Sequence, residues 1–206
     1  MRRSLGAAAF FLAFVGPAPS APADASLKEL RQTFTLDHKP IPPEVFGDFG
    51  DSDIADSGSI RVTIDLLAAM GSNLYYDDVA VSPEGWVSQK KEIPNGADKL
   101  TETTAYKFNG VTKNGLIVVT ASFSGGGTGE FVTLHILDAA IAHAFDGDGK
   151  LYDRLNLTVL RSIPLGDRWN GSVKIAGNAI TIATAPRATK TNNRKPGVQT
   201  IEAARP

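Results

Sequence analysis

The stretch Leu116-Ile117-Val118-Val119-Thr120-Ala121-Ser122-Phe123 decides the fold of this chain. Its odd positions are all apolar, whereas its even positions become polar at Thr120 and Ser122. A period of two residues is typical of a strand that buries one face. Asn114-Gly115 precedes the stretch and Gly125-Gly126-Gly127 follows it, so turns bound it at both ends. We therefore expect a middle strand of an antiparallel sheet.

The Asn-Gly pair before this strand predicts a hairpin. If Asn114-Gly115 is a two-residue turn, Phe108 falls opposite Ala121 and Tyr106 falls opposite Phe123. The aromatic side chains then join the apolar face of the central strand. Turn chemistry and hydrophobic pattern agree, which favours a hairpin at this position.

A second turn gives the same agreement nearer the carboxyl end. With Gly177-Asn178 as the turn, Ile175 falls opposite Ile180 and Val173 falls opposite Ile182. Both pairs place branched apolar side chains on one face, as a buried sheet face requires.

The remaining chain predicts more strands joined by short turns. Residues 60–66, 73–81, 85–90 and 151–163 alternate, and 131–145 is a long strand-like run that slips near Asp138, where we infer a bulge. Residues 93–99 are interpreted as a polar loop. The prediction is an all-β fold, an antiparallel meander of about eight to ten strands that form a sandwich or a barrel.

One short N-terminal helix is predicted beside these strands. Ser26-Leu27-Lys28-Glu29 has the spacing of a capping box, in which the Ser oxygen and the Glu carboxylate bond free N–H groups of the first turn. Leu27, Leu30 and Phe34 then share one helical face. That face would pack on the sheet or across one end of it.

The amino terminus has the layout of a secretory signal peptide. Arg2 and Arg3 precede an apolar run from Leu5 to Val15, and both Ala21-Pro22-Ala23 and Ala23-Asp24-Ala25 fit a cleavage site. The run is too short to span a bilayer, and no other segment has that length and apolarity. We expect a signal peptide over 1–25, a single β domain over 26–185 and a flexible basic tail over 186–206. The protein would be exported, either periplasmic or extracellular.

Composition narrows the chemistry. The chain has no cysteine, which excludes disulfides, thiol catalysis and zinc–thiolate sites. Between Asp24 and Ala185 there are 14 Lys and Arg residues against 21 Asp and Glu residues, a net charge of −7. An acidic body argues against nucleic acid as a partner. Nothing in the sequence indicates an oligomeric state.

Two acidic loops offer oxygen ligands for Ca²⁺. Asp51, Asp53 and Asp56 lie close together in one loop, and Asp146-Gly147-Asp148-Gly149, with Asp153 nearby, forms the other. Neither loop matches the twelve-residue calcium motif, and Asp and Gly are also common in hairpin turns. The sequence therefore offers Asp51, Asp53 and Asp56 as a calcium site, but nothing in it indicates that the protein requires a cofactor.

Aromatic residues beside carboxylates give a candidate ligand site. Tyr75, Tyr76 and Asp77 precede a turn, and Trp86 follows on the next strand. Aromatic faces with acids are suited to sugars, and paired carboxylates cleave glycosides. Adjacent Asp77 and Asp78 point to opposite sides of a strand, so they do not form such a pair with each other. Core aromatics beside solvated acids explain the same pattern.

Catalytic motifs are missing. Ser124, His135 and Asp138 supply the residue types of a hydrolytic triad, but there is no nucleophile elbow of the G-x-S-x-G kind. The glycine-rich loop 125–129 lacks the Lys-Ser/Thr ending of a phosphate-binding loop. The sequence thus favours an exported, non-catalytic β domain that binds a small molecule or an envelope protein. The alternatives are a sugar-directed hydrolase that uses the clustered acids and a structural or adhesive envelope module.

Overall fold

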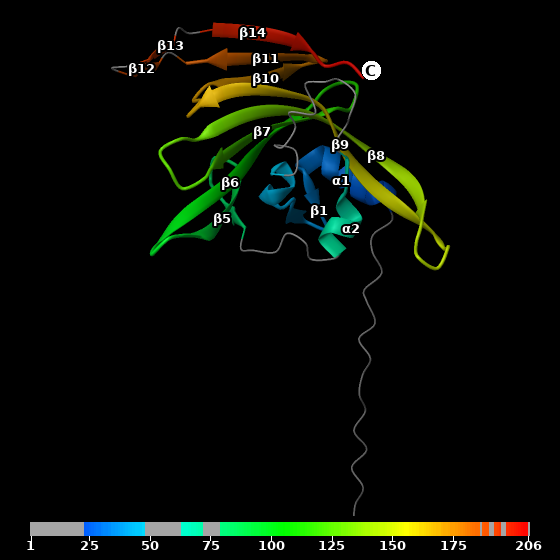
Figure 1. Cartoon of the computed structure of the whole chain (residues 1–206). Coiled ribbons are helices and arrows are strands. Elements are labelled where there is room, and N and C mark those ends of the chain that lie inside the picture. Colours follow the sequence, from blue (N-terminus) through cyan, green and yellow to red (C-terminus); the bar gives the residue numbers. More distant parts are fainter. Residues whose placement is uncertain are drawn as a thin grey trace, which may run out of the picture.

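The computed structural model describes residues 23–47, 63–71, 79–185, 187–189, 192–194 and 197–205 (Figure 1). The amino-terminal part holds the helical elements and four short strands: α1 Ala23–Thr33, β1 Thr35–Leu36, β2 Lys39–Pro40, the 3-10 helix η1 Pro43–Phe46, β3 Thr63–Asp65, α2 Leu66–Gly71 and β4 Ala80–Val81. The long strands follow: β5 Trp86–Asn95, β6 Asp98–Val111, β7 Ile117–Ser124, β8 Phe131–Phe145 and β9 Leu151–Asp167. The last part holds β10 Ser172–Ala176, β11 Ala179–Thr184, β12 Arg187–Thr189, β13 Asn192–Arg194 and β14 Gly197–Glu202.

The predicted all-β fold is confirmed. The main sheet has seven antiparallel strands in the order β3-β9-β8-β7-β6-β5-β4. From β4 to β9 each strand pairs with the next in the chain, so this part is a meander. A smaller sheet has the order β10-β11-β14, and the pairs β1-β2 and β12-β13 form two-stranded sheets.

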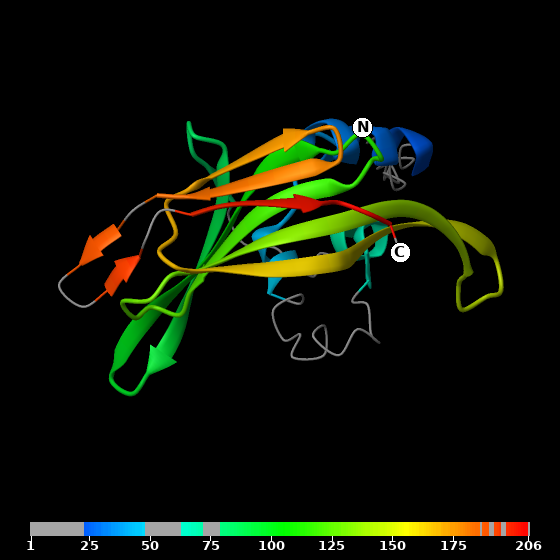
Figure 2. The same cartoon turned by 90° about the horizontal axis from the view of Figure 1, so that it is seen from above.

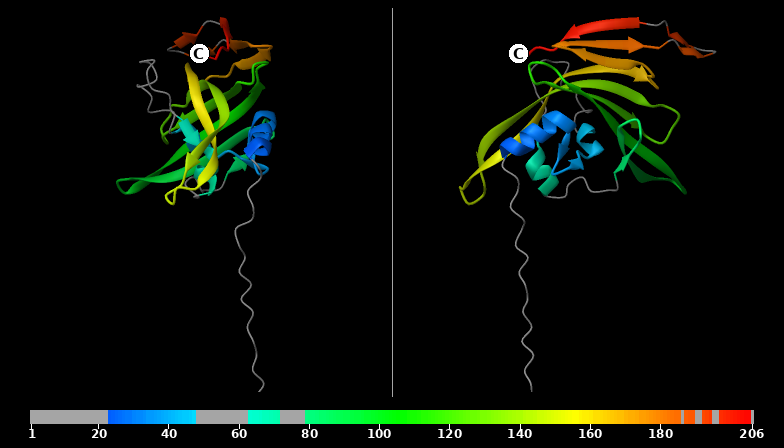
Figure 3. Two further views of the ribbon diagram at one scale, coloured as in Figure 1. Left: turned by 90° about the vertical axis from the view of Figure 1, so that its right-hand side faces the viewer. Right: turned by 180° about the vertical axis from the view of Figure 1, so that it is seen from behind.

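The elements form a sandwich around the main sheet, which curves over the helices (Figures 1 and 3). We call the face that α1, η1 and α2 cover the concave face, and the face that the β10-β11-β14 sheet covers the convex face. Figure 2, seen from above, shows the smaller sheet lying across β7, β8 and β9. Two hydrophobic cores result, one on each face.

The central strand β7 is buried on both faces, which the sequence pattern did not predict. Ile117 and Val119 belong to the core of the concave face, whereas Leu116, just before the strand, and Val118 belong to that of the convex face. Even Thr120 is buried, because its hydroxyl accepts a hydrogen bond of 2.8 Å from Asn109 Nδ2. A polar residue in the alternation therefore does not mark a solvated face here.

The β6–β7 register differs from the prediction by two residues. Tyr106 pairs with Ala121, and Phe108 pairs with Val119. The turn spans Thr112 to Leu116, and a bulge lies between Phe108 and Gly110. The inward face is unchanged by a shift of two, because side chains alternate with a period of two.

Of the other hairpin predictions, some are confirmed and one is wrong. The pairs Ile175–Ile180 and Val173–Ile182 are confirmed, and β8 pairs irregularly with β9 between Ile136 and Leu137, close to the predicted slip at Asp138. The prediction of a polar loop over 93–99 is wrong, because β5 and β6 stay paired as far as Asn95 and Asp98. Most of these hairpin residues are exposed on both faces, so no apolar alternation marks them.

The N-terminal helix is confirmed, with a different start and a different cap. It begins at Ala23, so Ser26 lies inside the helix and is buried. Glu29 reaches forward: its Oε1 accepts hydrogen bonds from Thr35 Oγ1 at 2.6 Å and from the His38 backbone N–H at 2.7 Å. Partial burial would raise the pKa of Glu29, but these hydrogen bonds, together with the charge of His38 and a hydrogen bond from the Asp37 backbone, outweigh it and lower the pKa overall.

Part of the expected flexible tail, among the residues that the structure describes, is packed against the smaller sheet. Residues 197–202 form β14, which pairs with β11 from Ala179–Glu202 to Thr184–Gly197. Ile201 and Ala203 are buried in the convex core. A single buried isoleucine among polar neighbours gives too weak a pattern to predict this strand. Likewise only residues 63–65 of the expected strand 60–66 are strand among those described, and Leu66 starts α2.

Candidate binding site on the concave face

The concave face carries a row of polar side chains where apolar ones would be expected. Antiparallel pairs share a face, so Val87 with Tyr106 and Gln89 with Thr104 all point inward. Phe46 of η1 packs over this row, with its ring centroid 5.0 Å from that of Tyr106. We call Gln89, Tyr106, His135 and Phe46 the concave-face site.

Gln89 is the most unusual residue of the site. Its side chain is only 3% exposed, and in the part of the chain that the structure describes neither its amide oxygen nor its amide nitrogen has a hydrogen-bond partner. A buried polar group without a partner costs about 1–3 kcal/mol of folding stability. Such a group at an inward-facing position of a strand therefore calls for a ligand, a water or another explanation.

Tyr106 repeats the pattern on the neighbouring strand. It is 1% exposed, and its hydroxyl makes no hydrogen bond of normal geometry with the described residues, although the Ile41 backbone approaches it. Gln89 lies opposite Thr104, so Gln89 and Tyr106 are diagonal neighbours, which lie about 7–8 Å apart in an antiparallel pair. Burial raises the pKa of Tyr106, and a weak hydrogen bond from the Ile41 backbone offsets only part of that rise. The phenol is neutral at every physiological pH.

His135 lies two strands further along on the same face. It pairs with Val119 of β7 and is 4% exposed. Its Nδ1 lies 3.0 Å from Ser162 Oγ, and its ring centroid is 5.7 Å from that of Phe46. Burial lowers the pKa of His135 to about 4, because a charged imidazolium loses hydration there. The imidazole is therefore neutral at pH 7.

These groups give the site a definite chemical character. Gln89 offers both a donor and an acceptor, Tyr106 offers a hydroxyl, and burial keeps Tyr106 and His135 uncharged. Phe34 closes the site on the helix side, since its ring lies edge-on to Tyr106 at 5.4 Å and stacks on Phe108 at 5.7 Å. Aromatic walls with neutral hydrogen-bonding groups suit an uncharged polar molecule.

The residues predicted from sequence lie elsewhere or cannot be placed. Tyr75, Tyr76 and Asp77 of the ligand prediction lie outside the described residues, as do Asp51, Asp53 and Asp56 of the calcium prediction. Trp86 is described: it is half-buried, pairs with Lys107 and neighbours Val87, so it points to the convex side, away from Gln89. The structure therefore does not bring Trp86 into the concave-face site.

The hydrolytic triad is not assembled. His135 bonds Ser162 instead of Ser124, and Asp138 pairs with Arg205 at 3.0 Å. Ser124 ends β7, beyond the last β7–β8 pair at Phe123 and Phe131, whereas His135 pairs with Val119. The acid and the hydroxyl thus lie at opposite ends of the strand pair.

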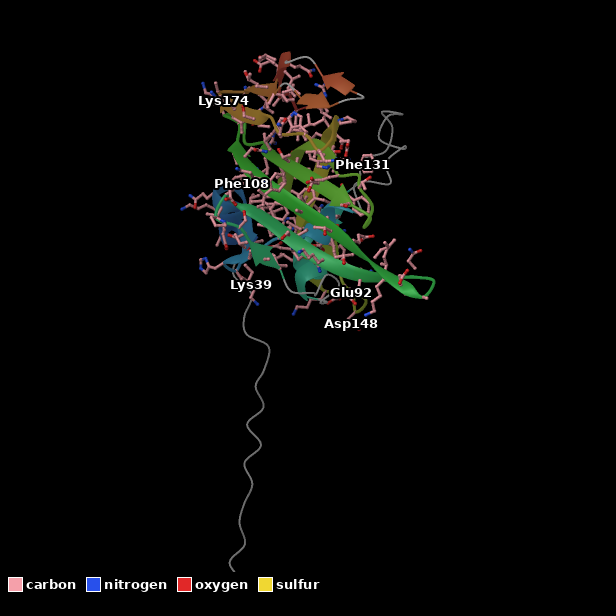
Figure 4. The ribbon with its side chains drawn as sticks, turned by 90° about the vertical axis from the view of Figure 1, so that its left-hand side faces the viewer. Lys39, Glu92, Phe108, Phe131, Asp148 and Lys174 are labelled. Atoms are coloured by element: carbon pink, nitrogen blue, oxygen red, sulfur yellow. The ribbon has the colours of Figure 1, made fainter. Side chains whose placement is uncertain are left out.

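Three further acids on the long strands and their turns bond to groups close to them and do not join the concave-face site. Glu92 pairs with Lys99 out on the β5–β6 hairpin, far from Phe108 in the packed centre (Figure 4). Asp153 bonds His143 at 2.7 Å, and Asp146 accepts backbone hydrogen bonds within its own turn. Within the described ranges, no three His, Asp or Glu side chains are placed to share a metal ion.

Comparison with known proteins gives no further guide. No protein-family model, no curated protein and no solved structure matches the chain. In the part of the chain that the structure describes, no helix has the length and apolarity needed to cross a bilayer. Function must therefore be inferred from the geometry of the chain's own residues.

Proposed function

We propose that this chain is an exported, non-catalytic β domain that binds an uncharged polar small molecule on the concave face of its main sheet. The observation that carries the proposal is the pair of buried, unpartnered side chains, Gln89 and Tyr106, on one face of adjacent strands. A ligand with a donor and an acceptor would satisfy both. The aromatic rings of Phe46 and Phe34 would cover its apolar parts.

The proposal of export depends on the sequence of residues 1–22, which lie outside the described residues. Of the two predicted cleavage sites, the one after Ala23 removes only the first residue of α1, whereas cleavage after Ala25 removes its first three residues. Cleavage after Ala23 is therefore favoured. N-terminal sequencing of the secreted protein gives the position directly, and an uncleaved N-terminus would contradict export through a signal peptide.

The ligand proposal is tested by thermal melts against uncharged sugars and lipids, using wild type and Gln89→Met. Met has a similar shape but no hydrogen-bonding amide, so we expect the free variant to be more stable by about 1–2 kcal/mol. A ligand that stabilises wild type should lose most of its effect on the variant. This opposite response is the signature of a polar group that serves binding at the expense of stability.

Gln199 provides the matched control, because it is an exposed glutamine on β14. Gln199→Met should change neither the stability of the free protein nor the response to a ligand. If Gln89→Met instead destabilises the free protein, the amide has a structural partner, such as an ordered water, and the proposal fails.

A second candidate function is attachment to a partner protein, and one observation favours it. The β8–β9 hairpin extends past β7, which begins opposite Leu137, and at its tip Phe145 and Leu151 face each other and are more than half exposed. Exposed apolar side chains on a projecting hairpin are typical of contact surfaces. Changing both residues to Ser should abolish binding to cell envelopes without lowering the melting temperature. Unchanged binding would dismiss this function.

A further inference from the structure

Two arginines from distant parts of the chain meet at one turn. Arg31 lies in α1, and Arg205 lies in the segment after β14 (Figure 3). Both approach Gly115 of the β6–β7 turn. A Cβ atom on this glycine would lie 3.7 Å from Arg205 Nη2, 3.8 Å from Arg31 Cζ and 3.9 Å from Arg31 Nε. The two guanidinium groups thus border the same small space.

The described residues supply one carboxylate to this space for the two positive charges. Arg205 pairs with Asp138, with 3.0 Å between Nη2 and Oδ1. Arg31 has no carboxylate partner among the described residues: its Nη2 donates to the neutral Ala139 carbonyl at 2.9 Å. Its Nε–H is enclosed and has no hydrogen-bond partner. Of the two guanidinium groups, only that of Arg205 has a carboxylate partner among the described residues, and the Nε–H of Arg31 lacks an acceptor.

Both side chains are held in place by the fold. Arg31 bonds the part of β8 that continues beyond β7, where Ala139 pairs only with β9. Since β7 begins opposite Leu137, no described strand pairs with this side of β8 at Ala139. The guanidinium supplies a donor where a further strand would have supplied one. Arg31 is thus fixed by a backbone contact and is not a freely moving surface charge.

A hydrogen-bond network fixes the turn and the C-terminal segment. Lys113 N–H donates to the Gly177 carbonyl at 2.8 Å, and Asn114 N–H donates to Asn178 Oδ1 at 2.9 Å. Asn114 Nδ2 donates to the Ala203 carbonyl at 2.8 Å, and Ala203 N–H donates to the Asn178 carbonyl at 2.9 Å. Two turns and the segment leading to Arg205 are therefore joined within a few residues of Gly115.

We propose that Arg31 and Arg205 form a binding site for a small oxyanion, a phosphate or a carboxylate, beside Gly115. An oxyanion would accept a hydrogen bond from Arg31 Nε and balance the second positive charge. Arg205 is half exposed, so the site opens to solvent on its side. Gly115 has a φ of 84°, which the turn itself requires, and its missing side chain leaves the space free. This site is separate from the concave-face site and does not depend on it.

The test is titration of the purified chain with inorganic phosphate, followed by calorimetry and thermal melts against sodium chloride at the same ionic strength. At matched ionic strength the general screening of surface charge is the same in both salts, so any difference between them reports specific binding. We expect phosphate to raise the melting temperature and chloride not to do so. A parallel titration with acetate distinguishes a phosphate from a carboxylate as the preferred oxyanion.

Three variants assign the binding to the arginine pair. Arg31→Lys keeps the charge but loses the Nε–H, and Arg205→Gln loses the exposed charge; each should weaken phosphate binding about tenfold or more. Lys113→Gln removes an exposed charge from the same turn and should change binding less than about twofold. A thermal melt in sodium chloride shows whether each variant is folded. If Arg31→Lys does not fold, phosphate binding by Arg205→Gln still tests the proposal. The proposal is overturned if phosphate and acetate act no differently from chloride, or if Lys113→Gln weakens binding as much as Arg205→Gln.

Discussion

The two faces of the main sheet are both buried, yet they differ in the side chains that fill them. The hydrophobic core of the convex face consists of Leu116, Val118, Leu134, Ile136, Ile180, Ile182, Ile201 and Ala203. Thr120 and Ser122 of β7 are buried on the same face, and the Thr120 hydroxyl accepts a hydrogen bond from Asn109. The concave face combines a larger apolar core with the buried polar groups of Gln89, Tyr106 and His135. The two faces thus differ in how their buried polar groups are bonded: Thr120 on the convex face has a hydrogen-bond partner, whereas the amide of Gln89 on the concave face has none among the described residues. The difference locates the candidate function on the concave face.

The convex face should give the largest effect when it is broken. Leu134 is fully buried there, so Leu134→Ala should destabilise the protein by about 2–5 kcal/mol through lost burial and a cavity. Urea unfolding measures the change. Val198→Ala, at an exposed position of β14, is the control and should change stability by less than about 0.5 kcal/mol. A cost below about 1 kcal/mol for Leu134→Ala would mean that the smaller sheet does not seal this core.

His135 should make the concave face sensitive to acid. Its pKa is about 4 in the folded protein and 6.5 in the unfolded chain, so between these values only the unfolded chain binds the proton. Stability should therefore fall as the pH is lowered from about 7 to about 4, by a total on the order of 3 kcal/mol. Urea unfolding across this range measures it.

His135→Gln isolates this contribution, because the amide can still bond Ser162 but does not titrate in this range. The acid-dependent loss should be smaller in the variant by the amount given above. Equal pH dependence in the two proteins would show that the imidazole is hydrated and not buried.

Tyr106→Phe, on the concave face, should stabilise the free protein, whereas the two preceding changes, Leu134→Ala and acidification, lower its stability. Removing a buried hydroxyl that has no partner should stabilise the free protein by about 1 kcal/mol. Tyr152→Phe, at an exposed position, is the control and should have no effect. A destabilised Tyr106→Phe protein would indicate a partner for the hydroxyl and would weaken the case for a ligand.

The smallest effect is expected outside both cores. Glu92 and Lys99 form an exposed ion pair on the β5–β6 hairpin, and Glu92→Gln should change stability by less than about 0.5 kcal/mol. The measurement is again urea unfolding, repeated in 1 M salt. A larger loss of stability would show that this hairpin contributes to the fold, although it lies outside both hydrophobic cores.

The fold was predictable wherever apolar alternation and turn residues coincided. The Gly177-Asn178 turn gave the correct β10–β11 register for that reason. The β6–β7 register was displaced because the turn spans Thr112 to Leu116 and a bulge follows Phe108, and neither feature is visible in the alternation. The strand β14 was missed because only Ile201 marks its buried face.

The concave-face site was less predictable, since it is defined by missing hydrogen bonds. One signal was available: Gln89 falls two residues after Val87, on the inward face of the predicted strand 85–90. A polar residue at such a position usually finds a partner, and only the packed structure shows that this one does not. Trp86 is predicted as a ligand-binding residue because it is aromatic, but it directly precedes the inward-facing Val87 and therefore lies on the other face of the strand.

The enclosure of β7 has a consequence for dynamics. Its two edges are paired with β6 and β8, and its two faces are covered by separate cores. Detachment of the helices uncovers one side of the strand, and detachment of the smaller sheet uncovers the other, but neither breaks its ladders. Its amide protons should therefore exchange with deuterium only when the whole molecule opens, so their exchange rates report the global free energy of unfolding.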